Sequence, residues 1–226
     1  MNFPGTPSPY PFFSGKYFGT GILFPGAVIT TNKEFWKYEG GNFTQLQDLP
    51  FNLYQPAAFD LEDELYVMGG LNPFGNPSSL VFRYTVASQL WETVSVIPDF
   101  QLFSSSPSFS YNGNIYFVGP TGNLWKFDTV TLQWEYMSSY PEGQLISGSC
   151  VVSGDKAFIG LADNRRTLWE YDITNNSWKA KKSIPFGGTL ESLGSWEYNG
   201  KIYYMLNTAL NQRYGIDVWE FDPNEY

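Results

Sequence analysis

Apolar and polar residues alternate in short runs along the whole chain. Between Leu124 and Asp128 every second residue is aromatic, namely Trp125 and Phe127, and this period of two is typical of a β-strand with one buried face. Asp128 can open a tight turn, because its carboxylate accepts hydrogen bonds from backbone N–H groups two residues on. Trp134 then starts a second apolar run. The stretch therefore predicts two antiparallel strands joined by a turn.

The same pattern recurs five times. The second aromatic residue of the five copies is Tyr38, Tyr84, Phe127, Tyr171 and Phe221, spaced by 43 to 50 residues. A second signature precedes it: Asn112-Gly113 and Asn199-Gly200 lie between apolar runs, where both residues of a two-residue hairpin need positive φ. Each copy thus predicts two hairpins, which make four antiparallel strands in one sheet.

Repeats of about 45 residues that each form a four-stranded sheet are typical of the blades of a propeller. The predicted repeats cover residues 11–50, 51–98, 99–141, 142–185 and 186–226. No linker or low-complexity segment separates them, so we expect a single all-β domain over residues 1–226.

The repeats resemble those of kelch-type β-propellers. The resemblance rests on the aromatic-glycine strand end, the Tyr/Phe-Asp turn and the tryptophan six residues after that aspartate, and it covers nearly the whole chain. It implies five antiparallel blades of four strands, with the last blade lacking its outer strand. The chain departs from the family pattern in its glycines, because only Gly69-Gly70 keeps the double glycine.

The two ends of the chain suggest one interrupted blade. Phe3-Pro4-Gly5 resembles the end of a repeat, whereas no tryptophan follows Phe221. Three alternatives stay open: a ring closed by a thin fifth blade, a piece of a larger ring, or a second chain that covers the seam. An unpaired aromatic edge favours association, so a homo-oligomer through the incomplete blade is one expected partner arrangement.

Composition narrows the function. The net charge of −9 disfavours nucleic acid as a partner, because such a surface repels phosphates. No run of 18 apolar residues predicts a membrane span, and no signal peptide is visible. The compartment stays open, with an extracellular or periplasmic one favoured.

The absence of histidine removes most catalytic arrangements. Ser-His-Asp and Cys-His sites need an imidazole, as do the copper oxidases that share the kelch fold and the usual zinc sites. We therefore expect no catalytic residues, no metal and no cofactor. The single cysteine, Cys150, is interpreted as a small buried hydrophobe. The tryptophans that repeat in register predict packing between blades, and Trp196 is expected in the core of an inner strand.

Irregular loops carry the candidate binding residues. Arg165 and Arg166 share one loop, and Arg213 and Tyr214 lie near the end of an equivalent loop expected over Asn207–Gly215. Together they predict a positive patch for a carboxylate, an acidic sugar or an acidic peptide. Further candidates are Asn72 and Asn76 in an exposed loop, and Phe103 and Gln144, which the kelch resemblance places at the channel face.

These features favour a non-enzymatic binding or scaffold module that engages a protein or glycan ligand with its loop face. One alternative is an enzyme that uses carboxylates and arginine, of the type of the sialic-acid epimerases that share the fold. Another is a fragment or engineered chain whose main property is self-assembly.

Overall fold

The structure is a computed structural model that describes residues 3–6, 12–19, 32–99, 102–161, 165–184, 189–210 and 213–225. Within the last strands, the side chains of 189–191, 208–210 and 213–214 are not described. The chain divides into two compact units. Unit 1 comprises residues 1–104 and 128–134, and unit 2 comprises residues 105–127 and 135–226.

Unit 1 contains two four-stranded antiparallel sheets. Their strands, in spatial order, are β1 (Phe12–Ser14), β2 (Tyr17–Gly19), β3 (Phe35–Glu39) and β4 (Asn42–Gln45), then β5 (Ala57–Leu61), β6 (Glu64–Met68), β7 (Leu80–Thr85) and β8 (Leu90–Val96). Each strand pairs with the next one in the chain, so each sheet is a simple meander.

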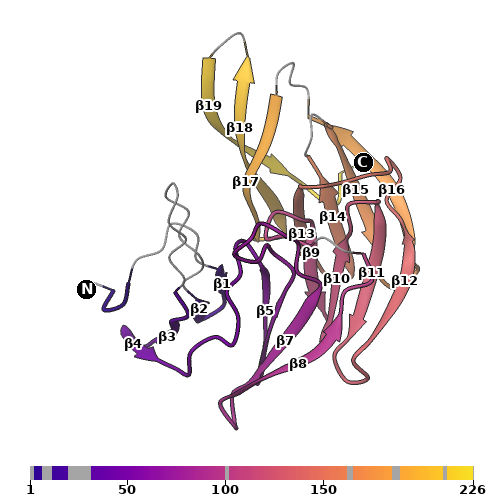
Figure 1. Cartoon of the computed structure of the whole chain (residues 1–226). Coiled ribbons are helices and arrows are strands. Elements are labelled where there is room, and N and C mark those ends of the chain that lie inside the picture. Colours follow the sequence, from indigo (N-terminus) through magenta and orange to yellow (C-terminus); the bar gives the residue numbers. More distant parts are fainter. Residues whose placement is uncertain are drawn as a thin grey trace. The chain divides into compact units, whose positions relative to one another are not determined.

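The third, fourth and fifth sheets follow the same plan, and Figure 1 traces them from magenta to yellow. Their strands are β9 (Ser108–Tyr111), β10 (Asn114–Val118), β11 (Asn123–Asp128) and β12 (Gln133–Ser139), then β13 (Ser149–Ser153), β14 (Lys156–Gly160), β15 (Thr167–Asp172) and β16 (Ser177–Ser183), and last β17 (Thr189–Tyr198), β18 (Lys201–Leu210) and β19 (Arg213–Phe221). Residues 128–134, which form the turn between β11 and β12 with the adjoining strand ends, belong to unit 1, and the rest of these sheets belongs to unit 2.

The predicted turn chemistry is confirmed. Asn112 and Gly113 have φ of 47° and 74°, and Asn199 and Gly200 have φ of 52° and 75°, as a two-residue hairpin requires. Asp128 Oδ1 accepts hydrogen bonds from the N–H groups of Val130 and Thr131, each at 2.9 Å. The repeated aspartates are therefore turn formers.

Successive sheets pack face to face through apolar side chains. In unit 1 one cluster joins the first sheet to the second, with Tyr17 and Phe35 against Leu65 and Tyr84. In unit 2 one cluster joins the third sheet to the fourth, and another joins the fourth to the fifth. The first strands of neighbouring sheets also touch, as β1 touches β5 and β13 touches both β9 and β17. Face-to-face four-stranded meanders with adjacent first strands are the blades of a β-propeller.

Several of the tryptophans in register pack between sheets, as predicted. Trp169 and Trp178 lie against the cluster between the third and fourth sheets, and Trp219 lies against the next one. The prediction for Trp196 is wrong. Its side chain is 42% exposed and stacks on Tyr203 at 5.7 Å, because it lies on the face of the last sheet that points away from the fourth.

The last sheet has three strands among the described residues, as the sequence predicted, but its strands are longer than expected. β18 and β19 stay paired up to Leu210 and Arg213, so the predicted loop over Asn207–Gly215 is wrong. The single-domain assignment stays a prediction.

Candidate functional site

Two loops of unit 2 bring charged and polar side chains together. One loop follows β12 and carries Glu142, and the other follows β14 and carries Arg165. Arg165 Nε lies 4.0 Å from Glu142 Oε2, and each side chain is about one quarter exposed (28% and 27%). At that distance the two charges attract without a close hydrogen bond, so the guanidinium keeps donors for another acceptor.

Tyr140 precedes Glu142 by two residues in the loop after β12. It is the first residue after β12 and is 1% exposed, with its ring edge-on to Trp178 at 5.6 Å. Burial raises the pKa of the Tyr140 phenol and the charge of Glu142 raises it further, against a smaller opposing effect of Arg165. The hydroxyl is therefore a neutral donor at ordinary pH.

Two donors of this cluster are buried and unsatisfied. The Tyr140 hydroxyl and Arg165 Nη1 have no hydrogen-bond partner among the described residues. An unpaired buried polar atom is costly, so such atoms are usually paired with water or a ligand. The sequence pointed to Arg165 but missed Tyr140, whose only signal is a tyrosine where other repeats carry isoleucine, at Ile97 and Ile184.

The other candidates of unit 2 are placed less favourably. Arg166 is half-buried, and its backbone carbonyl accepts a hydrogen bond from Ile184 N at 3.0 Å. Gln144 is exposed, two residues beyond Glu142. The backbones of Arg213 and Tyr214 start β19, but their side chains lie outside the described residues. Whether the arginine loops form one patch is therefore untested.

The unit 1 candidates are mainly structural. Asn72 Oδ1 accepts hydrogen bonds from the N–H groups of Phe74 and Asn76, at 2.9 and 3.1 Å, and so holds its own loop together. The Asn76 backbone carbonyl in turn accepts a hydrogen bond from Asn72 N at 2.9 Å. Phe103 is half-buried beside Leu102, whose carbonyl accepts from Gly70 N at 2.7 Å.

Cys150 fits its predicted role as a small hydrophobe. It packs against the cluster between the third and fourth sheets, and burial raises the pKa of its thiol. A thiol that stays protonated is a poor nucleophile.

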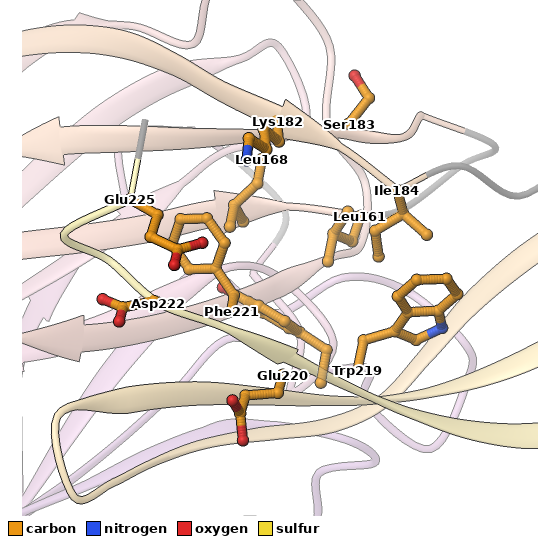
Figure 2. Close-up of a pocket in the computed structure, with 11 residues that line it drawn as sticks. Leu161, Leu168, Lys182, Ser183, Ile184, Trp219, Glu220, Phe221, Asp222 and Glu225 are labelled. Atoms are coloured by element: carbon orange, nitrogen blue, oxygen red, sulfur yellow. The ribbon is translucent and has the colours of Figure 1, made fainter.

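A second candidate site is a pocket of about 190 Å³ between the fourth and fifth sheets (Figure 2). Its apolar wall comes from β15, β18, β19 and the residues that directly follow β14 and β16, and comprises Leu161, Leu168, Ile184, Tyr204, Trp219 and Phe221. Its polar residues are Lys182, Ser183, Glu220, Asp222 and Glu225. Pockets for whole drug-sized ligands usually measure about 300–1,000 Å³, so this one is sized for a single side chain or ring.

The pocket also contains unsatisfied donors. The Tyr204 hydroxyl, on a residue that is 1% exposed, and Trp219 Nε1 are buried without a partner among the described residues. Burial raises the pKa of Tyr204 well above its ordinary value, so this hydroxyl is a donor too.

Comparisons with known proteins support the fold and leave the function open. No family model matches the chain, and no curated protein matches its sequence. Many solved structures match its fold, among them one titled "Structure of YjhT", with a TM-score of 0.69 and 18% sequence identity. The match covers 89% of this chain and 73% of that one. The chain is a β-propeller. Because the sequence identity is only 18%, this similarity is evidence for the fold and not for the function. The described part of the chain also contains no helix with the length and hydropathy needed to span a bilayer.

Proposed function

We propose that the chain is a non-enzymatic binding module of the kelch type, which binds a carboxylate group of a protein or glycan at the loops around Arg165. The observation that carries the proposal is the pair of buried, unsatisfied donors, Arg165 Nη1 and the Tyr140 hydroxyl. A guanidinium and a neutral hydroxyl can bind one carboxylate together, since charge-assisted hydrogen bonds to arginine are strong and directional.

Glu142 adds selectivity to this cluster. Its carboxylate can accept hydrogen bonds from ligand hydroxyl groups, whereas it repels a second anionic group. An acidic sugar supplies both a carboxylate and hydroxyls, and an acidic peptide with a neighbouring serine or threonine does the same. Both ligand classes named from the sequence therefore remain in the proposal.

The kelch assignment within this proposal rests on the repeated residues and their places in the sheets. The Asp turn recurs in the last three sheets and a tryptophan follows at the same position in the second, third and fourth, whereas the double glycine, Gly69-Gly70, occurs in the second sheet alone. The double glycine has a steric role in the second sheet. Gly69 has φ of +73°, and a Cβ there would lie 2.0 Å from the Leu102 carbonyl oxygen.

Binding to arrays of sialylated and neutral glycans, and of acidic and neutral peptides, tests the proposal. We expect Arg165→Ala to weaken binding of acidic members at least about tenfold, because a buried charged hydrogen-bond donor is lost. Lys179→Ala is the matched control, since it removes one positive charge from an exposed outer strand. Equal binding of the acidic members by wild type and Arg165→Ala would exclude this site.

The enzymatic alternative has one observation in its favour, the approach of Arg165 to Glu142 in the loop region. Against a role for Tyr140 as general base stands its raised pKa, which keeps the phenol protonated. Interconversion of sialic-acid anomers, followed by NMR, separates the two functions. Turnover that disappears in Arg165→Ala would replace binding by catalysis.

A further inference from the structure

The loop between β6 and β7, residues 69–79, displays an aromatic side chain at its tip. The corresponding loop of the third sheet, between β10 and β11, comprises only residues 119–122. Phe74 is 84% exposed, which is the largest exposed fraction of any aromatic side chain among the described residues. Single exposed apolar residues are common on protein surfaces, so the case for a binding role depends on how the loop holds this ring.

Hydrogen bonds within the loop fix the shape of its tip. Asn72 Oδ1 accepts from the N–H groups of Phe74 and Asn76, at 2.9 and 3.1 Å. Gly75 N donates to the Asn72 carbonyl, and Asn72 N donates to the Asn76 carbonyl, each at 2.9 Å. The backbone that presents Phe74 is therefore ordered before any ligand arrives, and this lowers the entropy cost of binding.

The base of the loop is bonded to the rest of unit 1. Leu71 N donates to the Tyr54 carbonyl at 2.9 Å, and Tyr54 N donates to the Leu71 carbonyl at 2.8 Å. Gly70 N donates to the Leu102 carbonyl at 2.7 Å, and Ser78 N donates to the Gly70 carbonyl at 2.9 Å. The scaffold of unit 1 therefore sets the position of Phe74, as a preorganised binding site requires.

The amide of Asn72 has an orientation that leaves its amino group free. Two backbone N–H groups point at one atom of this amide, so that atom is the oxygen and the other is the nitrogen. Asn72 Nδ2 donates no hydrogen bond to any described residue, and the same holds for the exposed side chain of Asn76. Amide donors thus lie two residues before and two residues after Phe74.

The loop is uncharged. No residue from Leu65 to Phe82 carries a charge, although the whole chain has a net charge of −9. The carboxylate ligand proposed for Arg165 therefore has no charged partner here. An aromatic ring flanked by neutral amides suits a neutral ligand that has both an apolar face and hydroxyl groups.

Neutral sugars in the pyranose form have this chemistry. In a β-linked glucose ring the hydroxyls are equatorial, so each face of the ring consists of axial C–H groups with a slight positive charge. The face of an aromatic ring is negative, and the two faces attract. The hydroxyls at the edge of the sugar can then accept hydrogen bonds from amide N–H groups. An apolar pocket of another protein could also enclose Phe74, but the free amide donors on both sides of the ring favour a ligand that carries hydroxyls.

We propose that the loop of residues 69–79 binds a neutral, β-linked glucose oligomer. The ring of Phe74 stacks on the C–H face of one sugar unit, and the amides of Asn72 and Asn76 donate to its hydroxyls. This site belongs to unit 1, whereas the Arg165 cluster belongs to unit 2, and the proposal does not depend on the function proposed for that cluster.

Titration of the intact chain with cellotetraose, a β-linked glucose oligomer, tests the proposal. Binding is followed by NMR through the backbone amides of residues 71–79. Mannitol is the control ligand, because it carries hydroxyls but has no ring face. We expect saturable shifts of these amide signals with cellotetraose and none with mannitol.

Variants of the ring test the stacking contact. Phe74→Ala should weaken binding of cellotetraose about tenfold or more, as for an exposed aromatic anchor, and Phe74→Tyr should retain binding because the ring stays. Val130→Ala is the matched control. Val130 is 91% exposed in the turn between β11 and β12 of unit 1, so this change removes an exposed apolar side chain without touching the loop.

Asn72→Asp separates the structural role of this side chain from its role in binding. The aspartate keeps an oxygen that accepts from the N–H groups of Phe74 and Asn76, but it removes the amino donors. We expect binding to weaken about threefold or more, while the amide signals of the free loop stay close to those of wild type. An unchanged affinity in this variant would contradict the amide contact.

The absence of saturable shifts with cellotetraose would overturn the proposal, and so would an equal response to mannitol or equal binding by Phe74→Ala. The mass of the protein in solution, measured by light scattering, covers the protein alternative. A dimer that dissociates in Phe74→Ala would assign the loop to contact with a second copy, and this result too would overturn the assignment to a sugar.

Discussion

At the scale of single residues, two buried tyrosines differ in whether their hydroxyl groups have a hydrogen-bond partner. Tyr140 and Tyr171 are both almost fully buried, and burial raises the pKa of each phenol. Tyr171 donates to Asn176 Oδ1 at 2.9 Å, whereas the Tyr140 hydroxyl has no partner among the described residues. Their similar surroundings make them a matched pair for mutation.

We expect Tyr171→Phe to lower the free energy of unfolding by about 1 kcal/mol, because it removes a satisfied hydrogen bond. Tyr140→Phe should leave stability unchanged within about 0.5 kcal/mol, or raise it, since an unpaired polar atom is removed. Urea denaturation measures both. An equal loss in the two variants would show that the Tyr140 hydroxyl is bonded in the folded protein, and would weaken its assignment to a ligand.

Asp172 predicts how stability changes in acid. Hydrogen bonds from Lys156 and then from Asn175 hold the pKa of its carboxyl below the ordinary value of 3.8. A depressed pKa stabilises the folded protein fully above the unfolded value, and this stabilisation is lost as pH falls through the folded value. We therefore expect Asp172→Asn to flatten the fall in melting temperature between about pH 5 and pH 2. Superimposable acid profiles of wild type and variant would contradict this.

At the scale of elements, most strands could be predicted from the residues at turns and strand ends. Alternation, Asn-Gly pairs and Asp turns are local signals, and they located four complete sheets and the three strands of the fifth. The length of β18 and β19 and the exposure of Trp196 were missed. These two features depend on which face of the last sheet is covered by another sheet. The sequence of one repeat does not show which of its faces is covered.

The candidate site was predictable only in part for the same reason. Arg165 stands out in the sequence because it breaks the repeat, whereas Tyr140 occupies a position of ordinary core residues. Tyr140 comes close to Arg165 only because the loops after β12 and β14 approach each other in the fold, which the sequence does not show. For Asn72 the sequence did not predict that the side chain accepts hydrogen bonds from its own loop, and its role in ligand binding stays a prediction.

Gly69 offers a test of the close approach of two loops within unit 1. A Cβ at Gly69 would lie 2.0 Å from the Leu102 carbonyl oxygen, whereas Gly75, with a similar φ of +78°, has nothing within 4 Å. We expect Gly75→Ala to cost about 1 kcal/mol of unfolding free energy, from backbone strain alone. Gly69→Ala should cost at least about 2 kcal/mol, because the backbone must also shift. Equal costs, measured by urea denaturation, would contradict the packing of Gly69 against Leu102.

At the scale of the whole molecule, the chain combines a repeated scaffold with an irregular cluster in unit 2. Five sheets, three of which have a turn-forming aspartate, pack through interblade aromatics and account for most of the buried residues. The Arg165 cluster departs from the repeat and has buried donors without a partner among the described residues. In repeat proteins, departures from the repeat are where specific binding is expected.

The central claim is that the buried, unsatisfied donors of the Arg165 cluster bind a carboxylate group. The affinities of wild type, Arg165→Ala and Lys179→Ala for acidic and neutral glycans and peptides test it most directly. We predict that Arg165→Ala weakens binding of the acidic members at least about tenfold, and that Lys179→Ala does not. Equal affinity of wild type and Arg165→Ala for the acidic members would contradict the claim.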